Sequence, residues 1–388
     1  MNFLIILPFT IRGGAEEYAL TLASSAVTSG FEVHVAFPDI SAADSLKRDF
    51  LDHGIIYHTL NNSFEPFISS KILTKGITYI SEVLHLFKDV CPNTVMMVLP
   101  WPDKCLAPIL AAAFKNIPAV VVFQLVPPDY PKIPYFLKCI YKWTRGRKQQ
   151  WVAISDNNRE ILSRIYNVPA EDICRIYNGS RMPTSTLSES AESIRVDVRR
   201  ELAIPESSKI LLTVGRLHPQ KGYDCLINLA PSILNDFPGC FLVWAGEGEL
   251  RETLERSIQE QELNRRILLL GHRQDIHRLM RASDLFLFPS RFEGGQSFVI
   301  TEAMTSGLPI VSSNASGIGE VIHHNIHGLL SNVGDSDSFK KNIYWALQNP
   351  AEMHAMSLNA RIRANEFSEE KMISETIKLI HDKMFRDL

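Results

Sequence analysis

The stretch that decides the fold has the sequence RASDLFLFPSRFEGGQSFVITEAMTSGLPIV at residues 281–311. The apolar run at 285–288 has the length of a strand, and the Pro-Ser pair after it ends that strand. A helix is predicted from Ser297 to Ser306, because Ser297 is a suitable N-cap and Gly307 supplies the left-handed C-terminal stop. The stretch therefore predicts a strand, a glycine-rich loop and a helix, which together form one unit of a parallel sheet.

Two carboxylates accompany this loop and helix, Glu293 in the loop and Glu302 in the second turn of the helix. The start of a helix attracts anions, because its free N–H groups and its dipole both favour negative charge. Two acids would repel a phosphate, so we expect them to bind hydroxyl groups such as the vicinal diol of a sugar. An anion site beside sugar-binding acids indicates a nucleotide sugar as ligand.

A second motif follows the predicted strand at 211–214, where Gly215 and Arg216 lead to Lys221 and Gly222. Arg216 and Lys221 place two cations beside these glycines, and such cations can neutralise the charge of an anionic ligand. The alternative, two surface cations near a turn, leaves the glycines on either side unexplained.

These motifs resemble the donor site of the retaining family four glycosyltransferases, which have the GT-B fold. The shared elements are Pro-Ser, Glu-Gly, a second Glu before Ala-Met, Gly-x-Pro, and Gly-Arg-Leu with Lys-Gly. The resemblance implies an α/β protein of two Rossmann-like, doubly wound parallel-sheet domains that face an interdomain cleft. It also implies that Glu302 binds the ribose and Glu293 lies near the transferred sugar, while Arg216 and Lys221 hold the diphosphate.

The spacing of the two acids departs from the family pattern by one extra residue between Glu293 and Glu302. Either the loop bulges at Gly294 and Gly295, or Glu293 does not reach the sugar. The resemblance as a whole implies a donor-binding set of Gly13, Gly14, Gly215, Arg216, Lys221, Gly294, Gly295, Gln296, Ser297, Phe298 and Glu302.

The chain begins with a β-α-β pattern: a strand at 3–7, a helix that ends at Gly30, and a strand at 33–37. The Gly13-Gly14 pair between the first strand and the helix lets a ligand approach the backbone closely, although a tight turn is an equal alternative. In the resembling family this loop faces the cleft. We therefore expect Gly13 and Gly14 to contact the donor diphosphate or the acceptor.

Two further strands, at 95–99 and 119–123, flank a helix at 106–114. Ligands of doubly wound sheets bind beyond the carboxyl ends of the strands, which is where Gln124 falls. Retaining relatives commonly have a histidine there that contacts the donor sugar. Glutamine can donate and accept hydrogen bonds but cannot carry the charge of an imidazole. The predicted catalytic residues are Glu293, Gln124, Arg216 and Lys221.

A basic segment at 132–148 lacks acidic residues and interleaves lysine and arginine with aromatic side chains. Such a segment could rest on an anionic membrane surface or hold a lipid-diphosphate acceptor. It could equally be a solvated helix face whose aromatic side chains belong to the core.

The length of 388 residues predicts two domains. We assign residues 1–183 to an N-terminal acceptor-side domain and 195–366 to a C-terminal donor-binding domain. A polar linker is predicted at 181–194. In the resembling family the last helix, here 367–388, crosses back to the N-terminal domain.

The composition excludes several classes of protein. A formal charge of −3 argues against a nucleic-acid binder. Six singly spaced cysteines favour reduced thiols in a cytoplasm, and the apolar start lacks the basic leader of a signal peptide. No run approaches the ~18 residues of a membrane span. We expect a cytoplasmic protein that is at most peripheral at the inner face of a membrane.

The sequence therefore predicts a retaining glycosyltransferase that needs neither metal nor cofactor. Its donor would be a UDP- or GDP-sugar, its acceptor a sugar or a lipid-linked molecule, and its place cell-surface polysaccharide assembly. No protein nucleophile is apparent. His323, His324 and His327 precede a turn at Gly328 and are not predicted to bind metal. The alternative is a transferase-like scaffold subunit that has lost turnover.

Overall fold

The chain forms two compact units in a computed structural model that describes residues 1–8, 12–60, 72–102, 104–131, 133–180, 190–295 and 297–385. Unit 1 comprises Met1–Asn178 with Glu370–Leu388, and unit 2 comprises Gly179–Glu369. These units divide the chain at 178/179 and at 369/370, where the sequence analysis assigned domains to 1–183 and 195–366 and a last helix to 367–388. Each unit holds one parallel sheet, so the predicted α/β class is confirmed.

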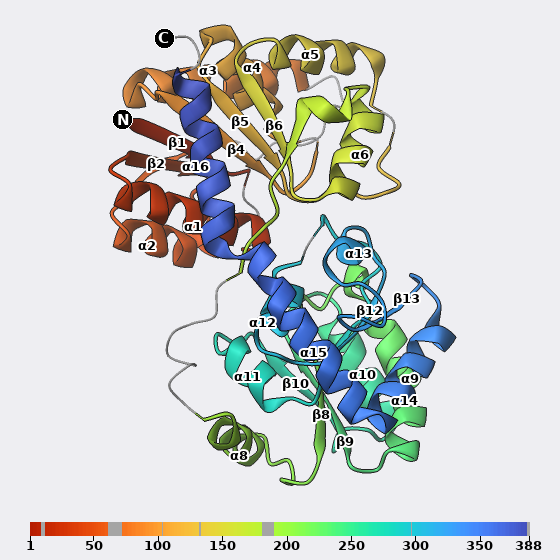
Figure 1. The fold of residues 1–388 in the computed structure, drawn as a ribbon. Helices are drawn as coiled ribbons and strands as arrows, with labels where there is room; N and C mark the ends of the chain where they lie inside the picture. The colour runs from red at the N-terminus through yellow and green to blue at the C-terminus, as the bar shows by residue number, and fades with distance from the viewer. Residues whose placement is uncertain are drawn as a thin grey trace. The chain divides into compact units, whose positions relative to one another are not determined.

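The sheet of unit 1 has the strand order β3-β2-β1-β4-β5-β6-β7, and its neighbouring strands are parallel (Figure 1). The inner strands are buried along their whole length, because helices cover both faces of a parallel sheet. The strands are β1 (Asn2–Ile6), β2 (Glu32–Phe37), β3 (Ile56–Thr59), β4 (Thr94–Leu99), β5 (Ala119–Phe123), β6 (Gln149–Ala153) and β7 (Ile173–Arg175).

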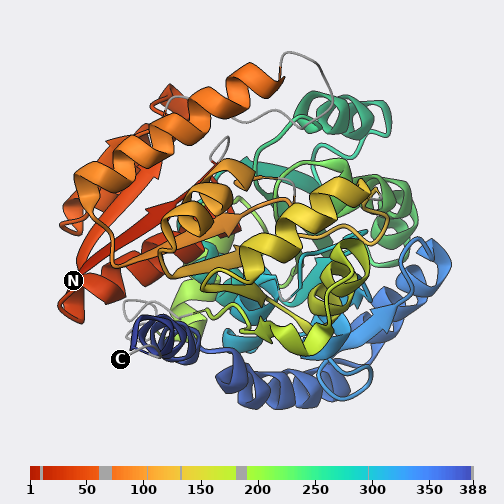
Figure 2. The ribbon, with the colours of Figure 1, turned by 90° about the horizontal axis from the view of Figure 1, so that it is seen from above.

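The helices of unit 1 divide between the two faces of this sheet. Helices α3, α4, α5 and α6 contribute to one apolar core with alternate residues of the strands, and α3 spans that face in orange in Figure 2. On α1, the hydroxyl of Tyr18 lies 3.4 Å from that of Thr376 on α16. The helices are α1 (Gly14–Thr28), α2 (Asp44–Asp52), α3 (Ile72–Val90), α4 (Leu106–Lys115), α5 (Tyr135–Arg145), α6 (Asp156–Tyr166) and α16 (Glu369–Phe385).

The sheet of unit 2 has the order β10-β9-β8-β11-β12-β13 and is also parallel. Its strands are β8 (Lys209–Val214), β9 (Cys240–Ala245), β10 (Ile267–Gly271), β11 (Leu285–Phe288), β12 (Ile310–Ser313) and β13 (Leu329–Ser331). Its helices are α8 (Ala191–Glu201), α9 (Tyr223–Asp236), α10 (Arg251–Glu260), α11 (Ile276–Ala282), α12 (Phe298–Thr305), α13 (Ile318–Val321), α14 (Ser336–Gln348) and α15 (Pro350–Ala364). Helices α9, α10 and α14 pack on one face of it.

The linker prediction is wrong over its last residues, while 181–189 lie outside the described residues. Helix α8 begins at Ala191, because Ser190 caps it by accepting a hydrogen bond from the N–H of Ser193 at 3.1 Å. Arg199 on this helix is only 1% exposed and donates to Asp284 at 2.9 Å. This part of the chain is an integral element of unit 2.

The basic segment contains side chains of both predicted kinds. Tyr141 is buried in the core, as the solvated-face alternative requires. Tyr135 and Phe136 on α5 are instead 82% and 58% exposed, so they do not belong to the core. Lys132, at the start of the segment, lies outside the described residues.

A histidine pair couples strands β2 and β3. The Nδ1 atom of His34 lies 2.9 Å from the Nε2 atom of His58, and His34 is 6% exposed. Burial lowers the pKa of His34 below 6.5 although Glu32 raises it. Burial lowers the pKa of His58, and the neighbouring His34 lowers it further, whereas Asp89 raises it. A hydrogen bond between the rings needs at least one unprotonated nitrogen, so it is lost when both rings are protonated.

This pair makes stability depend on pH. The pKa values of both histidines lie below 6.5 in the folded chain, so the unfolded chain binds protons first as the pH falls. The contribution of the pair to the free energy of unfolding is therefore fully present above pH 6.5 and decreases as the pH falls below that value. Urea unfolding should show less stability at pH 5.5 than at 7.5, and His58→Gln should reduce that difference. Exposed His85 provides the control His85→Gln, which should leave the difference unchanged. Equal effects of both variants would contradict the role of the pair.

Candidate active site

The candidate site in unit 2 is built where strands β8 and β11 end. These strands are neighbours in the sheet, so the loops after them start at the same edge. After β8 the chain passes through Gly215 and Arg216 into a single 3₁₀ turn at Pro219–Lys221, and Gly222 is the N-cap of α9. After β11 a loop leads to α12. The carboxyl edge of a parallel sheet is where such proteins bind ligands.

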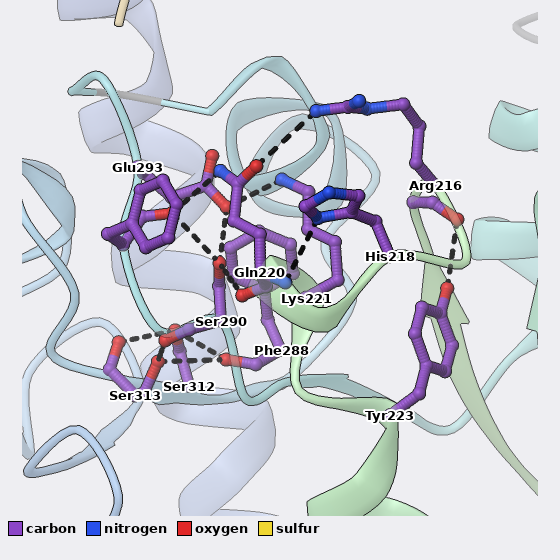
Figure 3. Close-up of polar contacts among 12 residues, drawn as sticks. Arg216, His218, Gln220, Lys221, Tyr223, Phe288, Ser290, Glu293, Ser312 and Ser313 are labelled. Atoms are coloured by element: carbon purple, nitrogen blue, oxygen red, sulfur yellow. Dashed lines mark hydrogen bonds and ion pairs between the residues drawn. The ribbon is translucent and has the colours of Figure 1, made fainter. Parts of the chain in front are cut away.

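The predicted phosphate cation and the predicted sugar-side acid meet in this site. The Nζ atom of Lys221 lies 2.5 Å from Oε1 of Glu293, and the hydroxyl of Ser290 donates to the same oxygen at 2.5 Å (Figure 3). The side chains of Lys221 and Glu293 are only 13% and 8% exposed. The ammonium also lies 5.0 Å from the ring centroid of Phe288. Glu293 was expected near the transferred sugar and Lys221 at the diphosphate of the same donor. In the structure the two side chains form an ion pair with each other.

Gln220, which the sequence analysis did not single out, connects the two loops. Its carbonyl oxygen accepts the Ser290 hydroxyl at 3.1 Å and the Arg291 N–H at 2.8 Å, and its side-chain amide donates to the Phe292 carbonyl at 2.8 Å. Its Oε1 accepts from Arg216 at 3.3 Å (Figure 3). The only sequence signal was its position inside the Arg-to-Lys motif. Gln220 therefore holds Arg216 and ties the loop that carries Lys221 to the loop after β11.

Glycines allow the site loops to approach other backbone closely. A Cβ atom on Gly222, whose φ is +73°, would lie 2.1 Å from the Pro289 carbonyl oxygen. A Cβ on Gly317 would lie 2.3 Å from Cα of Gly295. Gly215 donates its N–H to the Ala245 carbonyl at 3.0 Å, so this group is already used within the sheet. These contacts fix the loops after β8, β11 and β12 against each other.

Helix α12 carries the second acid. It starts at Phe298, with Ser297 at the N-cap, but in the described part of the chain the Ser297 side chain makes no capping hydrogen bond. Glu302 is half-buried in the second turn. Gly294 and Gly295 lie in the loop before the helix, and Gln296 lies outside the described residues. The helix was predicted from Ser297 to Ser306, and the structure has it from Phe298 to Thr305.

The predicted residues of unit 1 lie at the carboxyl edge of its own sheet. Gln124 follows β5, is 7% exposed, and accepts a hydrogen bond on Oε1 from Asn178 at 2.9 Å. Gly13 is the N-cap of α1, and its N–H donates to the carboxylate of Glu16 at 2.9 Å. Gly14 is the first residue of that helix. The carboxylate of Glu16 thus occupies the N–H of Gly13, a residue that we expected to contact the donor diphosphate or the acceptor.

The cluster of histidines before β13 bonds to backbone. The Nδ1 atom of His327 accepts the N–H of His323 at 3.1 Å, and that of His324 accepts the N–H of Leu330 at 2.9 Å. These rings shape the turn that leads into the edge strand.

Two family models match the chain, one in each half. The model described as Glycosyltransferase Family 4 matches residues 12–180, and the model described as Glycosyl transferases group 1 matches residues 195–363. The second match contains both loops of the candidate site.

Curated relatives include an uncharacterized glycosyltransferase of Methanocaldococcus jannaschii, which is 31% identical over 182 residues, or 46% of either chain. A UDP-Gal:alpha-D-GlcNAc-diphosphoundecaprenol alpha-1,3-galactosyltransferase of Escherichia coli is 30% identical over 256 residues, which cover 63% of this chain and 64% of that protein. The chain thus matches between about half and two thirds of the length of these relatives.

Solved structures resemble the whole chain. HepE of Anabaena, crystallised with UDP, has a TM-score of 0.79 at 20% identity and covers 98% of this chain and 100% of its own. A glycosyltransferase of Rickettsia africae has a TM-score of 0.84 at 18% identity, covering 99% and 98%. At these identities the likeness shows the fold, which is GT-B. With one family model matching each half, the chain belongs to the GT-B glycosyltransferases of family 4 and group 1.

Proposed function

We propose that this chain transfers a sugar from a nucleoside-diphosphate sugar to an acceptor and retains the anomeric configuration. The observation that carries the proposal is the cluster of Lys221, Glu293 and Ser290, with Arg216 held beside it by Gln220. A cation, a carboxylate and a second cation at the carboxyl edge of a parallel sheet match the groups of a sugar diphosphate.

In the proposed reaction the bond between the anomeric carbon and the diphosphate oxygen breaks, and its electron pair leaves with the diphosphate. Arg216 and Lys221 stabilise the charge on that oxygen. The acceptor hydroxyl attacks the anomeric carbon from the face that the diphosphate leaves, and its proton passes to the departing oxygen. Glu302 holds the ribose, while Glu293 and Gln124 orient the sugar. The glycines of the loops, with Ser297 and Phe298 at the start of α12, line the donor.

The ion pair between Lys221 and Glu293 gives donor binding a defined first step. Because both side chains are nearly buried, neither charge is stabilised much by solvent. A diphosphate that reaches Lys221 competes with Glu293 for the ammonium. The carboxylate that is released can then accept a hydrogen bond from a sugar hydroxyl.

The relatives suggest the donor and the acceptor. The name of the E. coli relative gives UDP-galactose as donor and a diphosphoundecaprenol-linked sugar as acceptor, and HepE was crystallised with UDP-glucose. We therefore favour a UDP-sugar over a GDP-sugar, and a lipid-diphosphate-linked sugar as acceptor. This chemistry belongs to the assembly of cell-surface polysaccharides.

A lipid-linked acceptor requires contact with a membrane, and we propose that an aromatic-basic patch supplies it at the inner face. None of the described helices has the length and apolar character needed to cross a membrane. The rings of Phe114 and Trp143 lie 5.2 Å apart, and Phe114 is 66% exposed. The patch consists of Phe114 from α4 and Tyr135, Phe136, Lys142, Trp143 and Arg147 from α5 and the residues after it. Exposed rings flanked by cations are typical of interfacial helices.

Reversing charges in the patch should weaken membrane binding. We expect Lys142→Glu with Arg147→Glu to lower affinity for vesicles containing phosphatidylglycerol by about tenfold or more, since each cation near an anionic surface contributes about 1 kcal/mol. Co-sedimentation at low and high salt measures this. Arg48→Glu with Arg256→Glu changes the charge equally at exposed positions outside the patch. Equal weakening by both pairs, or binding that ignores salt, would contradict a specific patch.

We also propose that transfer needs no metal, because Arg216 and Lys221 supply the positive charge that a metal would otherwise provide. Initial rates in excess EDTA should therefore equal rates in added Mg²⁺ or Mn²⁺ within about twofold. A tenfold or larger loss in EDTA, recovered by one of these ions, would contradict the proposal.

The decisive test of the function is binding of nucleotides. Thermal unfolding with UDP, GDP, ADP and their sugar conjugates should show stabilisation by UDP, about 2.7 kcal/mol at a hundredfold excess over Kd. Lys221→Met with Glu293→Gln, which removes both charges of the pair, should abolish the shift. If no nucleotide shifts the wild type, the scaffold alternative is favoured, for which Gln124 and the altered acid spacing are the supporting observations.

A further inference from the structure

We propose that His218 is a positioning residue, which holds the two cations of the candidate site in place for the donor diphosphate. His218 lies between Arg216 and Lys221 in the sequence, and the sequence analysis gave it no role. The inference rests on the proposed function, because it names a residue that aligns these two cations with the diphosphate.

The main chain of His218 is bonded to both cationic residues. Its N–H donates to the Arg216 carbonyl at 2.8 Å, and its own carbonyl accepts the N–H of Lys221 at 2.9 Å. The residue before it, Leu217, donates its N–H to the Glu247 carbonyl at 2.8 Å, which attaches this loop to the loop after β9. His218 is therefore the residue at which the chain turns from one cation to the other.

The imidazole ring caps this turn. His218 is the N-cap of the 3₁₀ turn Pro219–Lys221, and its Nδ1 atom accepts the N–H of Gln220 at 3.1 Å (Figure 3). The first N–H groups of a helical turn have no partner within the turn, so a side-chain acceptor at the N-cap stabilises it. Asparagine is a preferred residue at such positions. Nδ1 of histidine and Oδ1 of asparagine are both bonded to Cγ, so the ring presents its acceptor where an asparagine would.

The residue that receives this cap, Gln220, is the one that holds Arg216. Its Oε1 atom accepts from Arg216 at 3.3 Å, and its side-chain amide donates to the Phe292 carbonyl at 2.8 Å. Without the cap, the N–H of Gln220 loses its acceptor, and the turn is free to shift. Such a shift moves Arg216 and the adjoining Lys221 together, away from the positions that fit a diphosphate.

The other ring nitrogen lies in a more exposed place. Because Nδ1 accepts from a backbone N–H, the neutral ring has its proton on Nε2. Nε2 lies 3.7 Å from Oε1 of Glu249, which is longer than a hydrogen bond, and the side chains of His218 and Glu249 are 40% and 65% exposed. An exposed pair at this distance contributes little. We therefore assign the positioning role to Nδ1.

The test replaces the ring with two amides that each keep one of its polar positions. In His218→Asn, Oδ1 can accept the N–H of Gln220, whereas His218→Gln keeps a polar group only near the position of Nε2. Isothermal titration calorimetry with UMP and UDP measures the gain in affinity from the second phosphate as the ratio of the two Kd values. We expect His218→Asn to keep this gain within about threefold and His218→Gln to reduce it by about tenfold, the effect of losing one hydrogen bond.

A matched control is the cap of another helix in unit 2. Asp335 is the N-cap of α14, and its side chain accepts the N–H of Ser338 at 2.9 Å. Asp335→Ala should lower thermal stability, as the loss of a cap does, and leave the gain from the second phosphate unchanged. An equal reduction by Asp335→Ala would mean that any lost cap has this effect and would refute the positioning role.

The outcomes for the two amide variants are equally decisive. Equal gains in His218→Asn and His218→Gln would refute the role of Nδ1. A gain that survives in His218→Gln but not in His218→Asn would assign the role to Nε2 and refute the inference as stated. Failure of the wild type to bind UDP would instead refute the proposed function, and the positioning role with it.

Discussion

Replacing Lys221 with alanine is expected to lower kcat for sugar transfer by about 10²- to 10³-fold, the usual loss for one fixed group aimed at charge that develops in the transition state. The ammonium is nearly buried and already held in place by Glu293, so its charge is fixed before the reaction begins. Steady-state kinetics with saturating UDP-sugar measures the effect.

The loss of kcat must be separated from a loss of folding. Removing Lys221 alone leaves the buried Glu293 carboxylate with the Ser290 hydroxyl as its one remaining side-chain partner among the residues that the structure describes, which costs about 3 kcal/mol of stability. The double variant Lys221→Met with Glu293→Gln removes both charges and should recover most of that stability. Its turnover should stay as low as that of Lys221→Ala. If the double variant regains transfer together with stability, the lysine is structural.

Replacing Gly222 with alanine is expected to lower the free energy of unfolding by about 3 kcal/mol or more. The residue has a φ of +73°, which costs a side chain about 1 to 2 kcal/mol, and the new Cβ would lie 2.1 Å from the Pro289 carbonyl oxygen. The loop after β11 must therefore move away from the start of α9. Equilibrium unfolding in urea measures the change.

Gly334 is the matched control for this glycine. Its φ is +81°, but a Cβ there would meet no atom within 4 Å, so Gly334→Ala should cost only about 1 kcal/mol. The difference between the two variants isolates the close approach of the loops. Equal losses would mean that Gly222 is needed for its backbone conformation alone.

The strands were largely predictable from the sequence. The predicted ranges for β5 and β11 agree with the structure, because a strand buried on both faces reads as one apolar run bounded by polar or turn residues. Helix α12 was predicted to within one residue at each end. Its C-terminal stop, Gly307, has the expected left-handed φ of +69°.

The contacts inside the site could not be read from the sequence. Lys221 and Glu293 are separated by 72 positions, and nothing local shows that the ends of β8 and β11 bring them together. Gln220 contacts Ser290 and Phe292, which are about as far away in the sequence, so nothing near Gln220 in the sequence indicated its role. The first four residues of α8 were assigned to a linker because the stretch 181–194 is rich in serine, threonine and glutamate, whereas the tertiary contact of Arg199 with Asp284 shows that the helix belongs to unit 2. The ribose role of Glu302 stays a prediction.

Helix α16 imposes an order on biosynthesis. It completes unit 1, yet it is translated after the whole of unit 2, and the two residues that join it to α1, Tyr18 and Thr376, are 358 positions apart. At about 5 to 20 residues per second, a ribosome needs on the order of half a minute to cover that interval. During this time the apolar surface around Tyr18 has no covering helix. We therefore expect the nascent N-terminal half to keep this apolar surface exposed until α16 is made, whereas unit 2 can finish folding first.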